Sequence, residues 1–305
     1  MSSNIIKGFI SLKKEKNAVL LVHNYQEPTI QIIGDFLGDS FELAKKANTV
    51  NNEIIVFAGA EFMAETAAIL NRDKKVLIPS TRAKCPMANM LSPKNIIEYR
   101  RMYPDAEVAV YVNTTAETKA EADICITSGN AVKIIRQLES SQVLVGPDRN
   151  LAHYIQSKVP NKEIIPIPTD GHCYVHRQFT TKDINILKEK FPEAIVLVHP
   201  ESEPDVQNLA DLICSTSGML SEVQRSSSSQ FIIATEIGIV DCLRREYPKK
   251  KFIPIRKDAI CVEQKRITLY NLYLSLLKEQ FIVNIPDKIA KKAYSSIKRM
   301  IDFST

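Results

Sequence analysis

The sequence predicts an α/β protein of three similar small αβα domains, each with a parallel sheet, arranged around a pseudo-threefold axis. Two observations support this fold class. Short apolar runs alternate with helical patterns along the chain, which is typical of parallel α/β units. The same runs return after 88 residues, the spacing that also separates Cys85, Cys173 and Cys261 (173 − 85 = 88 and 261 − 173 = 88). This internal period is domain-sized and exceeds the ~20–50 residues of solenoid repeats.

Four apolar runs define the expected strands of each copy, in the same order. The first strand is expected at 18–22 (AVLLV), 106–110 (AEVAV) and 194–198 (AIVLV). A short second strand is expected within 35–40 (DFLGDS), 123–128 (DICITS) and 211–216 (DLICST). The third is expected at 54–58 (IIVFA), 142–146 (QVLVG) and 230–234 (QFIIA), and the fourth at 74–78 (KKVLI), 162–166 (KEIIP) and 250–254 (KKFIP). Such β-branched runs are typical of strands covered on both faces.

Helical patterns lie between these runs and beyond them. Each copy opens with an amphipathic segment, namely NIIKGFISLKKEK, PKNIIEYRRMYP or KDINILKEKFP, and EFMAETAAIL and NLAHYIQSK are helical patterns within the copies. Residues 262–305 lie outside the repeat, and ITLYNLYLSLLKEQ and IAKKAYSSIKRMIDF predict two closing helices. We expect domains at 1–84 (packed with the helices of 262–305), 85–172 and 173–261. Because no low-complexity linker separates them, we expect a compact triangle.

Composition narrows the functional class. Of 305 residues, 45% are apolar and 25% charged, and the net charge of +5 (40 − 35) is spread along the chain, so we expect neither nucleic acid nor a membrane as partner. No apolar run approaches the roughly 20 residues that span a bilayer, and the apolar core of MSSNIIKGFISLKKEKN is too short for a signal peptide. Six cysteines are too sparse for a disulfide scaffold. We therefore expect a reducing, cytoplasmic location and thiol or metal chemistry.

Polar side chains follow the expected strands in register, at the end of a parallel sheet where chemistry is usually placed. At intervals of 88 residues they form four columns: His23, Tyr111 and His199; Tyr25, Asn113 and Glu201; Ser40, Ser128 and Thr216; and Cys85, Cys173 and Cys261. If the domains pack around the axis, these columns converge and the three cysteines meet.

Each of these residues also has a structural interpretation. A single histidine after a strand often serves a turn, and Ser or Thr after a strand is often an N-cap. Glu201 could cap a helix near Pro204. Asp35, Asp123 and Asp211 are expected to be structural turn residues, and Cys125, Cys214 and Cys242 to be core or surface residues. We expect supporting or structural roles for His153, His172 and His176.

Three converging thiolates suit a metal. Zinc with three cysteines and one water is possible, and so is a 4Fe–4S cluster, in which three ligands leave one iron open as a Lewis acid. Spacing alone does not separate the two. Glu201, the one carboxylate in the four columns, is the best candidate for a general base, while Tyr25, His23 and His199 can also move protons. Ser40, Ser128, Thr216 and Asn113 can hold anionic oxygens. Such a site suits condensation and dehydration of small, multiply charged acids.

Several segments between residues 18 and 261 resemble the quinolinate synthase family, in the same order: HNYQEPTIQIIGDFLGDSFELA, FMAETAAIL, YVNTTAETKAEADICITSGNAV, PDRNLAHY, GHCYVH, HPESEPDVQNLADLICSTSGM and TEIGI. The resemblance implies a cytosolic enzyme of de novo NAD biosynthesis. Members condense iminoaspartate with dihydroxyacetone phosphate to quinolinate, losing phosphate and two waters. They have three α/β domains around a pseudo-threefold axis and a 4Fe–4S cluster held by three cysteines. A functional link to an iminoaspartate-producing enzyme is expected.

Carried over by motif, the resemblance implies a role for each column. Cys85, Cys173 and Cys261 are cluster ligands, Glu201 a general base and Tyr25 a proton donor and acceptor. Tyr111, Asn113 and His199 bind substrate near the open iron, and His199 is also counted as a catalytic residue. The carboxylate or phosphate oxygens of the substrates are held by His23, Ser40, Ser128 and Thr216. The chain departs from the family at Ser202, where cysteine is frequent, and at Gln264-Lys265, where Met-Lys is frequent. An open-iron hydro-lyase acting on another acid and a zinc-stabilised non-catalytic α/β protein remain the alternatives.

Overall fold

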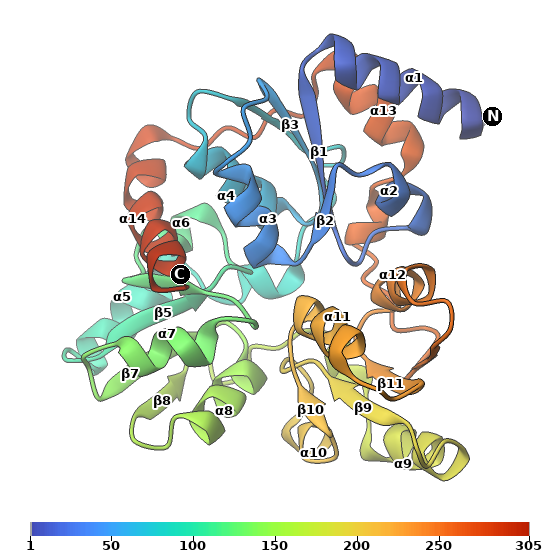
Figure 1. Cartoon of the computed structure of the whole chain (residues 1–305). Helices are drawn as coiled ribbons and strands as arrows, with labels where there is room; N and C mark the ends of the chain where they lie inside the picture. The colour runs from blue at the N-terminus through green and yellow to red at the C-terminus, as the bar shows by residue number, and fades with distance from the viewer. Residues whose placement is uncertain (1, 305) are drawn as a thin grey trace.

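Three parallel four-stranded sheets form the framework of the computed structural model, which describes residues 2–304 (Figure 1). The first sheet contains β1 (Ala18–His23), β2 (Phe36–Gly38), β3 (Ile54–Ala58) and β4 (Lys75–Leu77). The second contains β5 (Glu107–Tyr111), β6 (Ile124–Ile126), β7 (Gln142–Gly146) and β8 (Glu163–Pro166). The third contains β9 (Ile195–Val198), β10 (Leu212–Ile213), β11 (Gln230–Ala234) and β12 (Lys251–Pro254).

The three sheets share one strand order, β2-β1-β3-β4 and its equivalents β6-β5-β7-β8 and β10-β9-β11-β12. Every strand coincides with a run expected from the repeat, although β1 and β5 each extend one residue beyond it, and the central strands are almost completely buried. The predicted fold class of three similar α/β units with parallel sheets is therefore confirmed. Buried β-branched runs explain it, because each strand packs helices on both faces of its sheet.

Helices precede and follow the strands as the patterns predict. The opening helices of the units are α1 (Ser2–Glu15), α5 (Pro93–Met102) and α9 (Thr181–Lys190). The other helices within the units are α2 (Pro28–Ile33), α3 (Ser40–Ala47), α4 (Glu61–Leu70), α6 (Ala116–Lys119), α7 (Ala131–Gln137), α8 (Arg149–Lys158), α10 (Pro204–Gln207), α11 (Thr216–Arg225) and α12 (Gly238–Glu246). Short 3₁₀ turns η1 (Pro86–Asn89), η2 (His176–Gln178) and η3 (Gln264–Arg266) follow the three repeated cysteines.

The aspartates that begin the second strand of each unit are structural, as expected. Each carboxylate accepts a hydrogen bond from a backbone amide of the neighbouring central strand. The pairs are Asp35 with Leu20 (2.8 Å), Asp123 with Val108 (2.7 Å) and Asp211 with Val196 (2.7 Å). Both partners repeat at the same interval, so this contact fixes the start of the second strand identically in all three units.

The two C-terminal helices close the assembly in different places. Helix α13 (Leu269–Lys278) packs on α1 and β3 of the first unit. Helix α14 (Asp287–Ser304) packs on α6, α7 and β6 of the second unit and on α4 of the first, as the red ribbon beside α6 shows (Figure 1). The segment 262–304 therefore joins the first two units. The domain limits at 84/85, 172/173 and 261/262 remain a proposal, and their outermost residues 1 and 305 lie outside the described part.

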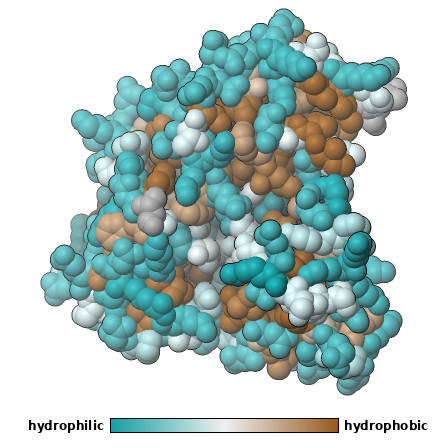
Figure 2. Space-filling model, in the orientation of Figure 1, coloured by the Kyte–Doolittle hydropathy of each residue, from teal (hydrophilic) through white to brown (hydrophobic). Residues whose placement is uncertain are grey.

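The visible surface is mainly polar. Figure 2 shows a face that is mostly hydrophilic, with smaller apolar areas between the polar side chains. Within residues 2–304, no helix combines the length and the apolar character needed to cross a bilayer.

Candidate active site

One cavity collects all twelve residues of the four polar columns. The space free of protein atoms, including solvent at the mouth, is about 680 Å³. The first three columns lie at the ends of the first and second strands of each sheet or just after them, and the cysteines lie in the loops that follow β4, β8 and β12. The convergence that the repeat predicted is therefore present, while the roles of the individual residues remain predictions.

The two histidines of the first column have the same hydrogen-bonding state. The backbone amide of Tyr25 donates to Nδ1 of His23 (3.2 Å), and the amide of Glu201 donates to Nδ1 of His199 (3.4 Å). Burial lowers the pKa of each imidazole to about 3, so both rings are neutral at neutral pH. Because Nδ1 is an acceptor, the proton lies on Nε2. Each ring therefore offers an Nε2–H donor, the group that binds carboxylate or phosphate oxygens.

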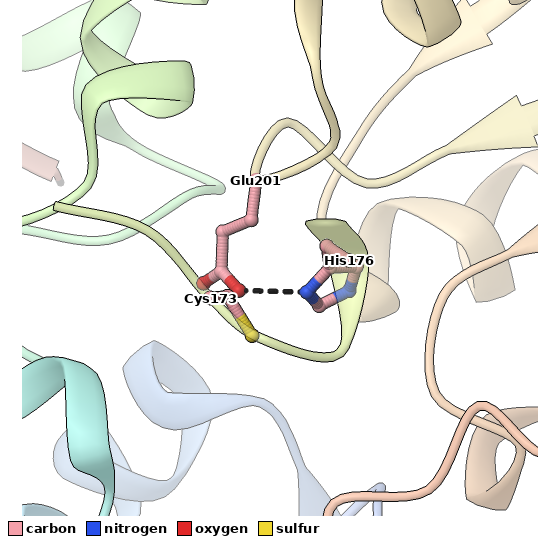
Figure 3. A group of neighbouring side chains, drawn as sticks. All are labelled: Cys173, His176 and Glu201. Atoms are coloured by element: carbon pink, nitrogen blue, oxygen red, sulfur yellow. Dashed lines mark ion pairs between the residues drawn. The ribbon is translucent and has the colours of Figure 1, made fainter. Parts of the chain in front are cut away.

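Glu201 is a buried, ionised carboxylate held by side chains from two units. Tyr111 donates its hydroxyl to Oε1 (2.6 Å), and Nδ1 of His176 lies 2.9 Å from Oε2 (Figure 3). Burial opposes ionisation, but the His199 and His176 imidazoles and the hydrogen bonds from His176 and Tyr111 outweigh it and hold the pKa of Glu201 well below its usual range. Glu203 is the residue at the N-cap of α10, and it makes no side-chain cap. The capping interpretation of Glu201 is therefore wrong.

A series of close polar contacts connects Glu201 to Tyr25. Beyond His176, the Nε2 atom of that ring lies 2.8 Å from Oγ1 of Thr235, which lies 2.7 Å from the hydroxyl of Tyr25. Since His176 presents Nδ1–H to the carboxylate, its Nε2 atom accepts the Thr235 hydroxyl. Thr235 in turn can accept from Tyr25. These four groups lie in a continuous series of polar contacts beside the cavity.

The side chains of Ser40, Ser128 and Thr216 do not cap the helices beside them. Asp39 caps α3 by accepting from the amides of Phe41 and Glu42, and Ser215 caps α11 by accepting from Gly218. Ser40 and Thr216 are therefore the first helical residues, one position inside the cap, and the N-cap interpretation is wrong for both. In the second unit Asn130 occupies the N-cap of α7, two residues after Ser128. These hydroxyls face the cavity beside helix N-termini, where anions are favoured.

The three repeated cysteines share one local geometry. All are free and partly buried, and the sulfur of each is approached by the backbone amide three residues later, that of Ala88, His176 or Gln264. Burial raises the pKa of Cys85 to about 12 and also raises the pKa values of Cys173 and Cys261, for both of which the nearby Cys85 thiol adds to the rise. Thiolates so placed need a cation, which is the condition of a metal site. The other cysteines lie elsewhere: Cys125 in β6, Cys242 in α12 and Cys214 just after β10.

A second set of possible metal ligands shares one of these thiols. Cys173, His176 and Glu201 bring one ligand atom each within 4.8 Å of the others (Figure 3). In this set, however, His176 and Glu201 are paired with each other, and Glu201 also binds Tyr111. The three-cysteine set has no such internal pairing, and its donors suit an iron–sulfur centre.

A buried ion pair lies behind the Cys261 loop. Glu236 is completely buried, and its carboxylate accepts the backbone amides of Gly238 (2.6 Å) and Cys261 (3.2 Å). Nζ of Lys265 lies 3.3 Å from this carboxylate and donates to the carbonyl of Tyr25 (2.6 Å). The pair therefore fixes a proposed metal ligand of the third unit relative to a proposed catalytic residue of the first.

Sequence reasoning missed three contributors to the cavity wall and its support. Thr235 directly follows β11, a position where functional side chains are common in parallel sheets. It was missed because the equivalent positions of the other two units hold Gly59 and Pro147, so no polar residue repeats there. His176 was expected to have only a supporting role, although it touches Glu201 directly. Gln264 was noted as a departure from the family pattern, and it lines the cavity.

Three parallel α/β units surround one cavity that is lined by thiols, neutral imidazoles and an ionised carboxylate, which is the arrangement of a three-unit α/β enzyme whose site could hold a metal. The model of the quinolinate synthetase A protein family matches residues 8–302. Curated relatives named quinolinate synthase are 51% identical over 301 residues in Pyrococcus abyssi (99% of this chain, 100% of the relative) and 52% identical over 294 residues in Pyrococcus furiosus (96% of each). A third, from Methanothermobacter thermautotrophicus, is 51% identical over 305 residues and all of both chains. The chain belongs to the quinolinate synthase family.

Proposed function

We propose that the cavity is the active site in which this member of the family condenses iminoaspartate with dihydroxyacetone phosphate. The products are quinolinate, phosphate and two waters. The observation that carries the proposal is the convergence of all twelve repeated residues on one cavity in a chain with the family pattern over nearly its whole length. Both substrates are small anions, which suits a cavity rich in neutral hydrogen-bond donors and helix N-termini.

Cys85, Cys173 and Cys261 would hold a 4Fe–4S cluster with one iron that lacks a protein ligand. The fit rests on the donor set, because three partly buried thiols of matching local geometry line the same cavity. When bound, such a cluster supplies a Lewis acid that polarises a carboxylate, hydroxyl or carbonyl oxygen of the substrate.

The side chains around this position would bind the substrates and exclude water. Nε2–H of His23 and of His199 would donate to carboxylate or phosphate oxygens, together with the hydroxyls of Ser40, Ser128 and Thr216. Asn113 would accept a hydrogen bond from a substrate hydroxyl or N–H group, since its Oδ1 atom is buried and has no hydrogen-bond partner within residues 2–304. Holding two reactants in one buried cavity also removes much of the entropic barrier to their condensation.

Glu201 would accept protons from substrate carbon and oxygen atoms during condensation and dehydration. Its low pKa keeps it ionised, but the hydrogen bond from Tyr111 also weakens it as a base. We therefore propose that the substrate takes over the Tyr111 hydroxyl on binding, which frees one carboxylate oxygen to act. Tyr25 would give a proton to a departing hydroxyl group of the substrate. Thr235 and His176, which connect Tyr25 with Glu201, would restore that proton.

An imine hydrolyses in water, so the enzyme needs a fresh supply of iminoaspartate. We propose that an iminoaspartate-producing enzyme in the same cytoplasmic compartment provides it. This location is the one that the sparse cysteines and the proposed oxygen-sensitive cluster require.

Anaerobic purification followed by iron, sulfide, zinc and product analysis tests the proposal. We expect a brown protein absorbing near 400 nm that forms quinolinate from the two substrates. A colourless zinc protein would overturn the cluster assignment, and a loaded protein that forms no quinolinate but dehydrates another acid would favour the hydro-lyase alternative.

Single variants separate the two possible ligand sets. If the three cysteines are the ligands, Cys85→Ser and Cys261→Ser lose iron and sulfide, whereas His176→Gln keeps them. The set of Cys173, His176 and Glu201 predicts the opposite pattern. The matched controls Cys125→Ala, Cys214→Ala and Cys242→Ala should keep full iron and sulfide content.

A further inference from the structure

The side chain of Tyr174 connects the loops of two of the three repeated cysteines. Tyr174 directly follows Cys173 and reaches the loop that carries Cys261. Its hydroxyl accepts the backbone amide of Val262 (2.8 Å) and donates to the carboxylate of Glu263 (2.6 Å). A phenol has a single proton to donate, so Tyr174 can give it to the carboxylate while it accepts the amide. One side chain therefore holds the two cysteine loops together.

Both ends of this link are fixed in the structure. The ring of Tyr174 is partly buried and packs, like both cysteines, on the apolar core of the third unit. The Cys261 loop is also held from its other side, because the amide of Cys261 donates to the buried carboxylate of Glu236 (3.2 Å). The carboxylate of Glu263 lies 3.9 Å from the sulfur of Cys261. The hydrogen bond from Tyr174 therefore ends beside a proposed metal ligand.

The link does not follow the threefold pattern of the chain. The positions equivalent to Tyr174 in the repeat are Pro86 and Val262 (174 − 86 = 88 and 262 − 174 = 88). Proline has no backbone N–H, so the Cys85 loop lacks the donor that Val262 offers to Tyr174. The tyrosine thus acts on one pair of the three proposed ligands, and Cys85 can serve as an internal reference for it.

We propose that Tyr174 is a positioning residue of the metal centre, which ties the Cys261 loop to the Cys173 loop and so slows the loss of the bound metal. This inference rests on the cysteine ligands of the proposed function but not on the proposed reaction. A ligand loop must open before its metal can leave, and hydrogen bonds to a neighbouring loop make that opening rarer. Removing the hydroxyl and keeping the ring should therefore speed metal loss.

Tyr174→Phe tests the proposal by the rate of iron release. Tyr154→Phe is the matched control, because the Tyr154 hydroxyl also crosses a unit boundary, from α8 to the carbonyl of Ile213 (3.4 Å) in β10. The loaded proteins are mixed anaerobically with an excess of the chelator bathophenanthroline disulfonate. We expect release to be about 10-fold faster in Tyr174→Phe, the equivalent of one lost net hydrogen bond, and within about twofold of the parent in Tyr154→Phe. Equal rates in Tyr174→Phe and the parent would overturn the proposal.

Substitutions at Glu263 test whether the two side chains act as one unit. Glu263→Gln keeps an acceptor for the tyrosine hydroxyl and should release iron at close to the parent rate, whereas Glu263→Ala should release it faster. A double variant of Tyr174→Phe with Glu263→Ala should be no faster than Tyr174→Phe alone, because both changes break the same link. Effects that multiply in the double variant would show that Glu263 acts independently of Tyr174.

Alkylation of the cluster-free protein tests the link without any metal. Iodoacetamide labelling, read for each cysteine by peptide mass spectrometry, should be faster at Cys261 in Tyr174→Phe than in the parent. Labelling of Cys85 should be unchanged. An unchanged rate at Cys261 would overturn the proposal, and an equal acceleration at Cys85 would show general loosening of the fold instead. These readouts hold whether the protein binds iron or zinc and whether or not it forms quinolinate.

Discussion

Replacing Lys265 by methionine should destabilise the protein strongly, because it removes a cation that pairs with a fully buried carboxylate. Lys265 is 14% exposed at its side chain and lies 3.3 Å from Glu236, which is 0% exposed. Breaking a buried ion pair from one side costs ~3–5 kcal/mol. Two backbone amides still bind Glu236 in the variant, from Gly238 and Cys261. We therefore expect a loss of about 3 kcal/mol, at the lower end of that range.

Urea unfolding of the cluster-free parent and variant measures this loss. At an m-value of ~3 kcal/mol/M, the midpoint should fall by about 1 M. Lys292→Met is the control, because Lys292 makes an exposed ion pair with Glu121 (3.1 Å), and exposed pairs contribute at most ~1 kcal/mol. Adding Glu236→Gln to Lys265→Met should recover most of the loss, since no uncompensated charge remains buried. A single variant as stable as the parent, or a double variant no better than the single, would refute the reasoning.

Four further predictions concern the chemistry and the repeat. Glu201→Gln should keep its cluster yet lower quinolinate formation by ~10²–10⁴-fold and accumulate a non-aromatic adduct; a rate within a few-fold of the parent would show that Glu201 is not the base. Tyr111→Phe removes a hydrogen bond to the ionised carboxylate and so raises the pKa of Glu201, which moves the acid limb of the pH–rate profile to higher pH; an unmoved limb contradicts the pairing. Asp123→Ala leaves the Val108 amide unpaired and should cost ~1–3 kcal/mol in urea unfolding, whereas a negligible loss would deny the aspartate its structural role. Air exposure should abolish turnover of the loaded enzyme before any thermal unfolding, and undiminished turnover after the cluster is bleached would exclude a Lewis-acid role.

The repeat made most of the fold and much of the site predictable. Features that recur in all three units, such as the cysteine loops and the aspartate at the start of the second strand, appear three times in the sequence. They could therefore be recognised by their spacing of 88 residues. The residues that sequence reasoning missed are those that occur once. Thr235, Gln264 and the Glu236–Lys265 pair act across unit boundaries, and nothing in one copy indicates which side chain of another copy it will meet. The helix caps were misplaced by one residue, because Asp39 and Ser40 are both good N-cap residues and only the backbone geometry decides between them.

The fusion of three alike units into one chain has a consequence for the symmetry of the chemistry. A ring of three separate identical units would offer every side chain three times. Three identical thiols suit a 4Fe–4S cluster, but three identical polar groups do not match a substrate whose two ends differ. On a single chain each position of a triplet can change independently. The cysteine and aspartate triplets have stayed uniform, whereas the triplet at Tyr25, Asn113 and Glu201 now holds three different groups. One polypeptide thus combines a threefold set of thiols with a cavity whose three sides carry different polar groups.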